Sequence, residues 1–135
     1  MAYILTDDLK TGNVLIDTEH QQLFDRINTL LDACTQGKGR LQIDTTLKFL
    51  NDYIVKHFND EEALQQKVQY PDYPNHKRYH ESYKKIVKDV IEEFEKDGTS
   101  ITLVAKVNTN IAGWLVNHIK SEDKKLASYI KQQGK

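Results

Sequence analysis

Apolar side chains recur along most of this chain at alternating steps of three and four residues, which is the spacing of one face of an α-helix. Beyond an N-terminal arm, turn-forming residues cluster in only three stretches, at 37–39, 70–75 and 97–100. The pattern therefore predicts an all-α fold in which a short irregular N-terminal arm precedes four helices. Since the connections are short, we expect an up-down-up-down antiparallel four-helix bundle.

The inward stripes of the first three helices contain polar residues at core positions. The first helix is predicted to begin near Asp17, a good N-cap, and its stripe is His20, Leu23, Ile27, Leu30, Leu31 and Cys34. The second stripe is Ile43, Leu47, Leu50, Ile54, His57, Glu61, Leu64 and Val68. The third helix starts just after Pro74, which suits a first turn, with the stripe His76, His80, Tyr83, Val87, Val90 and Phe94.

The last helix changes phase partway along its length. Its stripe runs through Val104, Val107, Ile111, Trp114, Leu115 and His118, and then resumes at Asp123, Leu126 and Ile130. On a regular helix at ~100° per residue, the five steps from His118 to Asp123 turn the carboxylate about 140° away from the imidazole. Because the later residues are in phase with Asp123, we predict a single-turn π-bulge between Trp114 and Leu126.

The topology brings the polar core residues together. The starts of the first and third helices lie beside the ends of the second and fourth, and all five histidines and two carboxylates fall in those parts: His20, His57, Glu61, His76, His80, His118 and Asp123. A single buried histidine is usually satisfied by one hydrogen bond. Seven such groups buried without a cation would compete for too few donors, at about 1–3 kcal/mol for each shortfall. The sequence therefore predicts a buried metal site.

The donor types narrow the metal. Imidazole with carboxylate suits iron, and also zinc, cobalt, nickel or manganese. A single zinc ion takes only about four donors, so seven indicate two ions bridged by the two carboxylates. If both ions are six-coordinate and also share one water-derived oxygen, about one of their twelve positions stays open. Such a centre, surrounded by apolar residues, is suited to binding one small molecule.

Composition excludes several classes of function. A chain of 135 residues predicts a single domain, over residues 1–135, and a net charge of −1 argues against nucleic acid or an anionic membrane as partner. No secretion signal or membrane-spanning apolar run is present, so we expect a cytoplasmic protein, and one acting as a monomer. The single Cys34 cannot form an internal disulfide or a cysteine cage, and we expect it to be a small buried apolar side chain.

The joint ligand spacing resembles that of the hemerythrin family, in its single-domain bacterial form. The matching segments are Ile16 to His20, His57-x-x-x-Glu61, His76-x-x-x-His80 and His118-x-x-x-x-Asp123. The resemblance implies a non-haem di-iron centre with an oxo or hydroxo bridge. In it, one iron would take His76, His80 and His118, the other His20 and His57, and both carboxylates would bridge. Dioxygen would bind at the iron with two histidines.

The resemblance also suggests roles for neighbouring residues. The oxygen pocket of the family would be lined here by Leu23, Phe58, Trp114, Leu115 and Ile119, although each of these also fits a plain core. Glu19 would either orient a ligand imidazole or, as we expect, lie exposed in the first turn. The arm departs from the bacterial pattern in carrying Tyr3 where tryptophan is common.

The expected function is reversible dioxygen binding, as a carrier, store or supplier to an unknown oxygen-consuming acceptor, rather than an enzymatic reaction. The alternatives are a sensor of oxygen or redox state and a di-iron oxidase, peroxidase or nitric-oxide-handling enzyme. The ferritin-like di-iron enzymes use Glu-x-x-His pairs, which the chain lacks. A zinc hydrolase is disfavoured because no His-Glu-x-x-His segment occurs.

Overall fold

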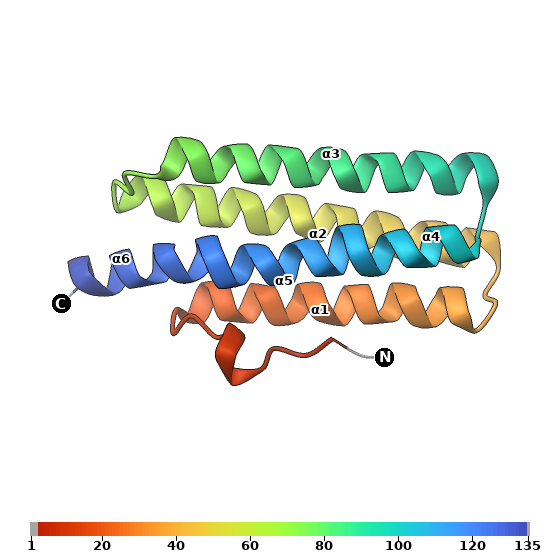
Figure 1. The fold of residues 1–135 in the computed structure, drawn as a ribbon, viewed down its shortest axis with the longest axis horizontal. Coiled ribbons are helices and arrows are strands. Elements are labelled where there is room, and N and C mark those ends of the chain that lie inside the picture. Colours follow the sequence, from red (N-terminus) through yellow and green to blue (C-terminus); the bar gives the residue numbers. More distant parts are fainter. Residues whose placement is uncertain (1–2, 135) are drawn as a thin grey trace.

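The computed structural model describes residues 3–134, and within this range the regular structure is entirely helical. In Figure 1 the helices form long rods that run in alternating directions along the chain, with the N-terminal arm lying against the first. The first three rods are α1 (Val14–Thr35), α2 (Arg40–Lys67) and α3 (Tyr73–Asp97). The fourth is α4 (Ile101–Lys106), η2 (Val107–Gly113), α5 (Trp114–His118), η3 (Ile119–Asp123) and α6 (Lys124–Gly134). The arm contains one 3₁₀ turn, η1 (Asp7–Leu9).

The first helix begins earlier than its sequence suggested. The predicted start near Asp17 is wrong, because Asn13 is the N-cap and its side-chain oxygen accepts a hydrogen bond from the Ile16 amide at 3.0 Å. The Asp17 carboxylate instead accepts hydrogen bonds from the Thr11 and Gly12 amides, at 2.8 and 3.1 Å. It therefore fixes the loop that leads into α1, while the cap lies one turn upstream.

The fourth rod contains the predicted π segment and a second one. In η3 the Lys124 amide donates to the Ile119 carbonyl, which is an i to i−5 bond, so the π-bulge between Trp114 and Leu126 is confirmed. The additional segment, η2, was not predicted. A sequence signal for it exists, because the buried positions Leu103, Val107, Ile111, Leu115, Ile119 and Asp123 follow each other at constant steps of four. At ~100° per residue, such a run drifts about 200° from a straight stripe, and wider turns correct the drift.

The arm is tied to the bundle by Tyr3. Its backbone exchanges two hydrogen bonds of 2.7 Å with the Asn28 side chain, and its hydroxyl donates to Asn108 Oδ1 at 2.8 Å. The ring also stacks on Phe24, with centroids 6.3 Å apart. Tyr3 therefore joins the arm both to α1 and to η2 in the last rod.

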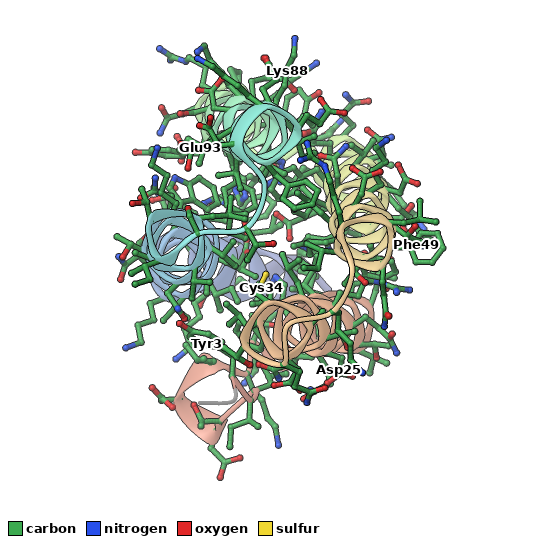
Figure 2. All side chains as sticks on the ribbon, turned by 90° about the vertical axis from the view of Figure 1, so that its right-hand side faces the viewer. Tyr3, Asp25, Cys34, Phe49, Lys88 and Glu93 are labelled. Carbon is green, nitrogen blue, oxygen red and sulfur yellow. The ribbon has the colours of Figure 1, made fainter. Side chains whose placement is uncertain are left out.

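Two apolar clusters fill the interior. The larger extends through all four rods and includes Cys34, which is buried as expected and points inward in Figure 2, whereas Phe49 points outward. The smaller cluster consists of Ile16, Tyr70 and Leu126 with their half-buried neighbours. The polar core residues come between them along the sequence, since His20 lies between Ile16 and Leu23, and Asp123 between Ile119 and Leu126. None of the described helices is both long and apolar enough to span a bilayer.

Candidate metal centre

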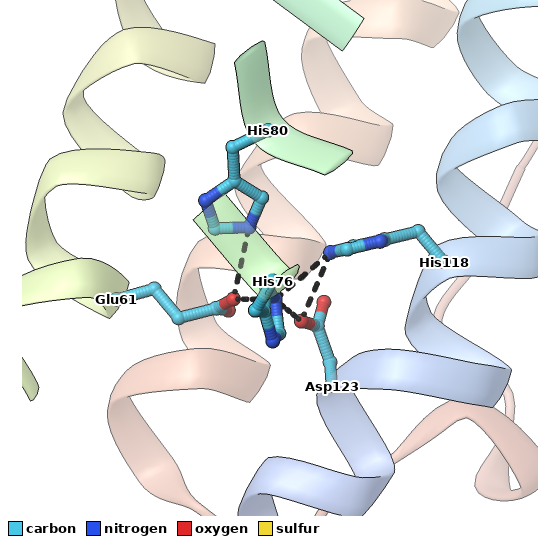
Figure 3. Close-up of side chains that lie close together, drawn as sticks. All are labelled: Glu61, His76, His80, His118 and Asp123. Atoms are coloured by element: carbon cyan, nitrogen blue, oxygen red, sulfur yellow. Dashed lines mark hydrogen bonds and ion pairs between the residues drawn. The ribbon is translucent and has the colours of Figure 1, made fainter. Parts of the chain in front are cut away.

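The seven predicted donors converge inside the bundle. They form two overlapping groups whose ligand atoms all lie within 4.8 Å of one another. One group contains Glu61, His76, His80, His118 and Asp123, which Figure 3 shows pointing toward a common centre. The other contains His20, His57, Glu61 and Asp123. Every one of the seven is buried, and the most accessible, His118, is only 4% exposed. The four rods each contribute at least one donor.

The two carboxylates belong to both groups, and each divides its oxygen atoms between them. Glu61 Oε1 lies 2.8 Å from His76 Nε2 and 3.2 Å from His80 Nε2, whereas Oε2 lies 3.3 Å from His57 Nε2. Asp123 follows the same arrangement: Oδ1 lies 3.1 Å from His76 Nε2, and Oδ2 lies 2.9 Å from His20 Nε2. Each carboxylate thus presents one oxygen to each group of imidazoles.

The polar atoms at the centre lack hydrogen-bond partners. Both oxygens of Glu61 and of Asp123 are buried without one, as is Nε2 of His20, His57 and His80. These atoms approach one another to about the length of a hydrogen bond but do not satisfy its geometry, and leaving them unpaired costs about 1–3 kcal/mol each. Cations at the centre would satisfy all of them, so the residues present fit a metal site.

Two buried carboxylates orient ligand imidazoles from behind. Glu19 Oε1 lies 2.8 Å from His57 Nδ1, and Glu62 Oε2 lies 2.8 Å from His80 Nδ1. Glu19 is 4% exposed, so its expected exposure is wrong and the alternative, an acceptor for a ligand imidazole, is correct. The reason is that α1 begins a turn before Asp17, which places Glu19 inside the bundle rather than at its entrance.

Glu62 was missed by the sequence reasoning. A signal was available, because Phe58, Glu62 and Gln65 follow at steps of four and three beside the main stripe of α2, and all three are buried. The buried face of α2 is therefore two stripes wide near the metal centre.

The electrostatics of the cluster favour positive charge. Burial lowers the pKa of His57, but the hydrogen bond with Glu19 and the nearby Glu61 carboxylate outweigh it and raise the pKa to about 10. Burial likewise lowers the pKa of His76, and Asp123 and Glu61 raise it to about 9. Burial raises the pKa of Asp123, yet the surrounding imidazoles hold it well below its ordinary value. In the metal-free protein, protons therefore compensate the two carboxylates, and metal ions would replace them.

The five residues expected to line an oxygen pocket lie beside the cluster, in two different environments. Leu23, Phe58, Leu115 and Ile119 are fully buried. Phe58 stacks on His80, with centroids 3.8 Å apart, and also lies 5.8 Å from His57, so it contacts both groups of donors. Trp114 is half-buried and instead faces a surface pocket beside His118, on whose ring it stacks at 4.6 Å.

Comparison with known proteins agrees with this geometry. Residues 11–130 match the family model described as "Hemerythrin HHE cation binding domain". The bacteriohemerythrin of Pseudomonas paraeruginosa is 33% identical over 131 residues, which cover 96% of this chain and 81% of that protein. The bacteriohemerythrin of Methylococcus capsulatus is 33% identical over 80% of each chain. A crystal structure of wild-type hemerythrin superposes with a TM-score of 0.83 at 29% identity, covering 96% of this chain and 97% of the other.

Proposed function

Because the chain belongs to the hemerythrin family, we propose that it binds dioxygen reversibly at a non-haem di-iron centre and acts as an oxygen carrier, store or supplier. The observation that carries the proposal is the division of oxygen atoms in Glu61 and Asp123, since a carboxylate that presents one oxygen to each donor group is arranged to bridge two ions. A site for one ion would not need this division.

The two donor groups contain unequal numbers of imidazoles. His76, His80 and His118 share one group, whereas His20 and His57 alone serve the other, so the second ion has fewer protein ligands. An ion with fewer protein ligands is the one that offers a position to an external molecule. Iron held there would supply electrons to dioxygen on binding and would take them back when dioxygen leaves. We therefore propose that dioxygen binds on the side of His20 and His57.

The protein's own contribution is to hold the donors and to keep water out. Glu19 and Glu62 each accept a hydrogen bond from the outer nitrogen of a ligand imidazole, which fixes the ring and its tautomer. Leu23, Leu115 and Ile119 belong to the fully buried apolar core and lie within three residues of the donors His20 and His118 in the sequence. Excluding water and protons slows the loss of reduced oxygen and the irreversible oxidation of the metal.

We prefer a binding protein to an enzyme or a sensor, because residues 11–130 match the hemerythrin cation binding domain and the seven donors are buried inside the bundle. An oxidase, peroxidase or nitric-oxide-handling enzyme and a redox sensor are the alternatives. A cytoplasmic, monomeric protein that passes oxygen to a separate acceptor belongs to the same proposal.

The test is metal analysis followed by anaerobic reduction and exposure to air. The proposal requires two irons per chain, a colourless reduced form that colours with oxygen, and bleaching under argon over repeated cycles. A stoichiometry of one, or colour that never reverses, would reject it. Rapid turnover of peroxide or nitric oxide by the reduced protein would favour the enzymatic alternative.

A further inference from the structure

A surface pocket of about 190 Å³ lies directly behind one of the donor imidazoles. Its lining comes from α3 and from the last rod: Tyr79, Trp114, Asn117, His118, Ser121 and Glu122. Two aromatic side chains and three polar ones thus surround the edge of His118. A molecule in this pocket would touch a metal-binding residue without entering the buried centre.

The ring of His118 connects the pocket to the centre. Its Nε2 lies 3.1 Å from His76 Nε2 and 3.3 Å from Asp123 Oδ1, and Figure 3 shows its other nitrogen on the far side of the ring. The outer nitrogens of His57 and His80 are covered by buried carboxylates, whereas His118 is the most accessible of the seven donors. His118 is therefore the donor that both lines a surface pocket and has the largest exposed fraction.

Trp114 lines the same pocket and lies against the His118 imidazole. Its indole is nearly parallel to the His118 imidazole, with centroids 4.6 Å apart and an interplanar angle of 17°. On the other side it stacks on Tyr83 at 4.2 Å and 14°. Stacking of this kind is favourable, and it places π-systems in contact from the pocket to the imidazole.

We propose that this pocket is the port at which a planar aromatic electron donor, of the reduced flavin class, docks and reduces the metal centre through Trp114 and His118. The proposal rests on the proposed function, because a reversible oxygen carrier that has been oxidised to the diferric form must be reduced before it binds oxygen again. Tyr79 is exposed and can stack on the flat rings of a flavin, whereas Trp114, whose two faces are already stacked, meets them at its edge. Asn117, Ser121 and Glu122 match the hydrogen-bonding edge of the flavin.

The reaction balances without further reactants. A dihydroflavin loses two electrons and two protons and leaves as oxidised flavin, while each of the two ferric ions gains one electron and becomes ferrous. The electrons pass one at a time through the stacked rings, and the protons are released to solvent. No bond forms between the flavin and the protein.

Docking is tested first without metal or redox chemistry. Trp114 is the only tryptophan of the chain, so the tryptophan fluorescence arises at this pocket. Riboflavin titrated into the metal-free protein should quench that fluorescence saturably. Ser121→Phe, at an exposed position in the pocket, should weaken binding about tenfold by filling it. The matched control is Asp52→Phe in a separate surface pocket on α2, with an expected change of less than about twofold.

Reduction is tested next on the diferric protein under argon. With photoreduced riboflavin, the second-order rate should fall about tenfold in Ser121→Phe, in step with the binding loss, and remain near the wild-type value in Asp52→Phe. Dithionite, which is smaller, should reduce both variants at similar rates. Trp114→Leu should slow reduction even at saturating flavin, because the stacked path is interrupted.

The outcomes separate the two proposals. Unsaturable quenching, or a wild-type reduction rate in Ser121→Phe, overturns the port; if that variant misfolds, Asn117→Phe fills the same pocket from another exposed position and is read in its place. Failure of the proposed function has a different signature, since the dithionite-reduced wild type would then not colour reversibly with oxygen, whatever the state of the pocket.

Discussion

Glu19→Gln should weaken one of the two metal ions selectively. The carboxylate is buried, lies 2.8 Å from His57 Nδ1, and belongs to the side with two imidazoles. Glutamine has nearly the same shape and still accepts a hydrogen bond, but it removes the negative charge that makes the imidazole a stronger donor. Its second partner, Lys56, lies 3.0 Å away and is largely exposed, so we assign no energy to that ion pair.

The expected loss of metal affinity follows from what groups that orient a ligand imidazole contribute at other metal sites. Losing the group that orients a metal-binding imidazole lowers metal affinity about 10–100-fold, which is about 1.4–2.7 kcal/mol. Because glutamine keeps the hydrogen bond, we expect the lower end, about tenfold, and only for the ion bound by His20 and His57. The ion bound by three histidines should change by less than about twofold.

The matched variant is Glu62→Gln, which alters the same kind of contact at the same 2.8 Å distance, but on His80 in the other group. It should weaken the other ion by a similar factor. Anaerobic competition with a chelator, followed by the stepwise release of two ferrous ions, measures both affinities in each protein. If both variants weakened the same release step, or neither weakened any, the division of the donors into two groups would be wrong.

Three further predictions concern the apolar wall around the centre, the protonation of two donor histidines and the removal of the metal. Leu115→Ala opens the apolar wall and should speed autoxidation severalfold while costing about 2–5 kcal/mol of stability, measured by visible decay in air and by urea unfolding; an unchanged decay rate would count against the water-excluding role. In the metal-free protein the pKa values of His57 and His76 are raised from 6.5 to about 10 and about 9, so their stabilisation is complete below pH 6.5 and is lost as pH rises through those values. Unfolding midpoints that stay constant from pH 6.5 to 10 would contradict this. Chelation should lower the free energy of unfolding by about 2.7 kcal/mol for each bound ion, relative to protein at a hundredfold excess of metal over its Kd, and calorimetry of both forms checks it.

Much of the metal centre was predictable because two sequence patterns indicate it: the helical spacing of the donors, and the change of phase in the last helix. The stripes of α2 and α3 have ordinary helical period, so the inward positions of His57, Glu61, His76 and His80 follow from spacing alone. The change of phase after His118 then predicted η3. A regular α-helix would turn Asp123 away from His118, and one wider turn brings the carboxylate back to the interior. In each case one periodic pattern determined both the fold and the chemistry.

The features that were missed depend on contacts between segments. The start of α1 was decided by Asn13 and by a loop bound to Asp17, and neither has a periodic signature. That shift also hid the buried role of Glu19, whose partner His57 lies 38 positions away in sequence. The position of Trp114 at a surface pocket likewise depends on Tyr79 of another helix. Contacts between particular side chains, whether a few residues apart or between helices, leave no regular spacing for sequence reasoning to find.

The division of the apolar interior has a consequence for how metal enters and leaves. Beyond the donors, the described residues form a small cluster at that end of the bundle, Ile16, Tyr70 and Leu126 with their half-buried neighbours. Such a small group should resist local opening less than the larger cluster does. Amide hydrogens at the start of α1 and along α6 should therefore exchange faster in the metal-free protein than those in the middle of the helices, and we expect the ions to be loaded and released at that end.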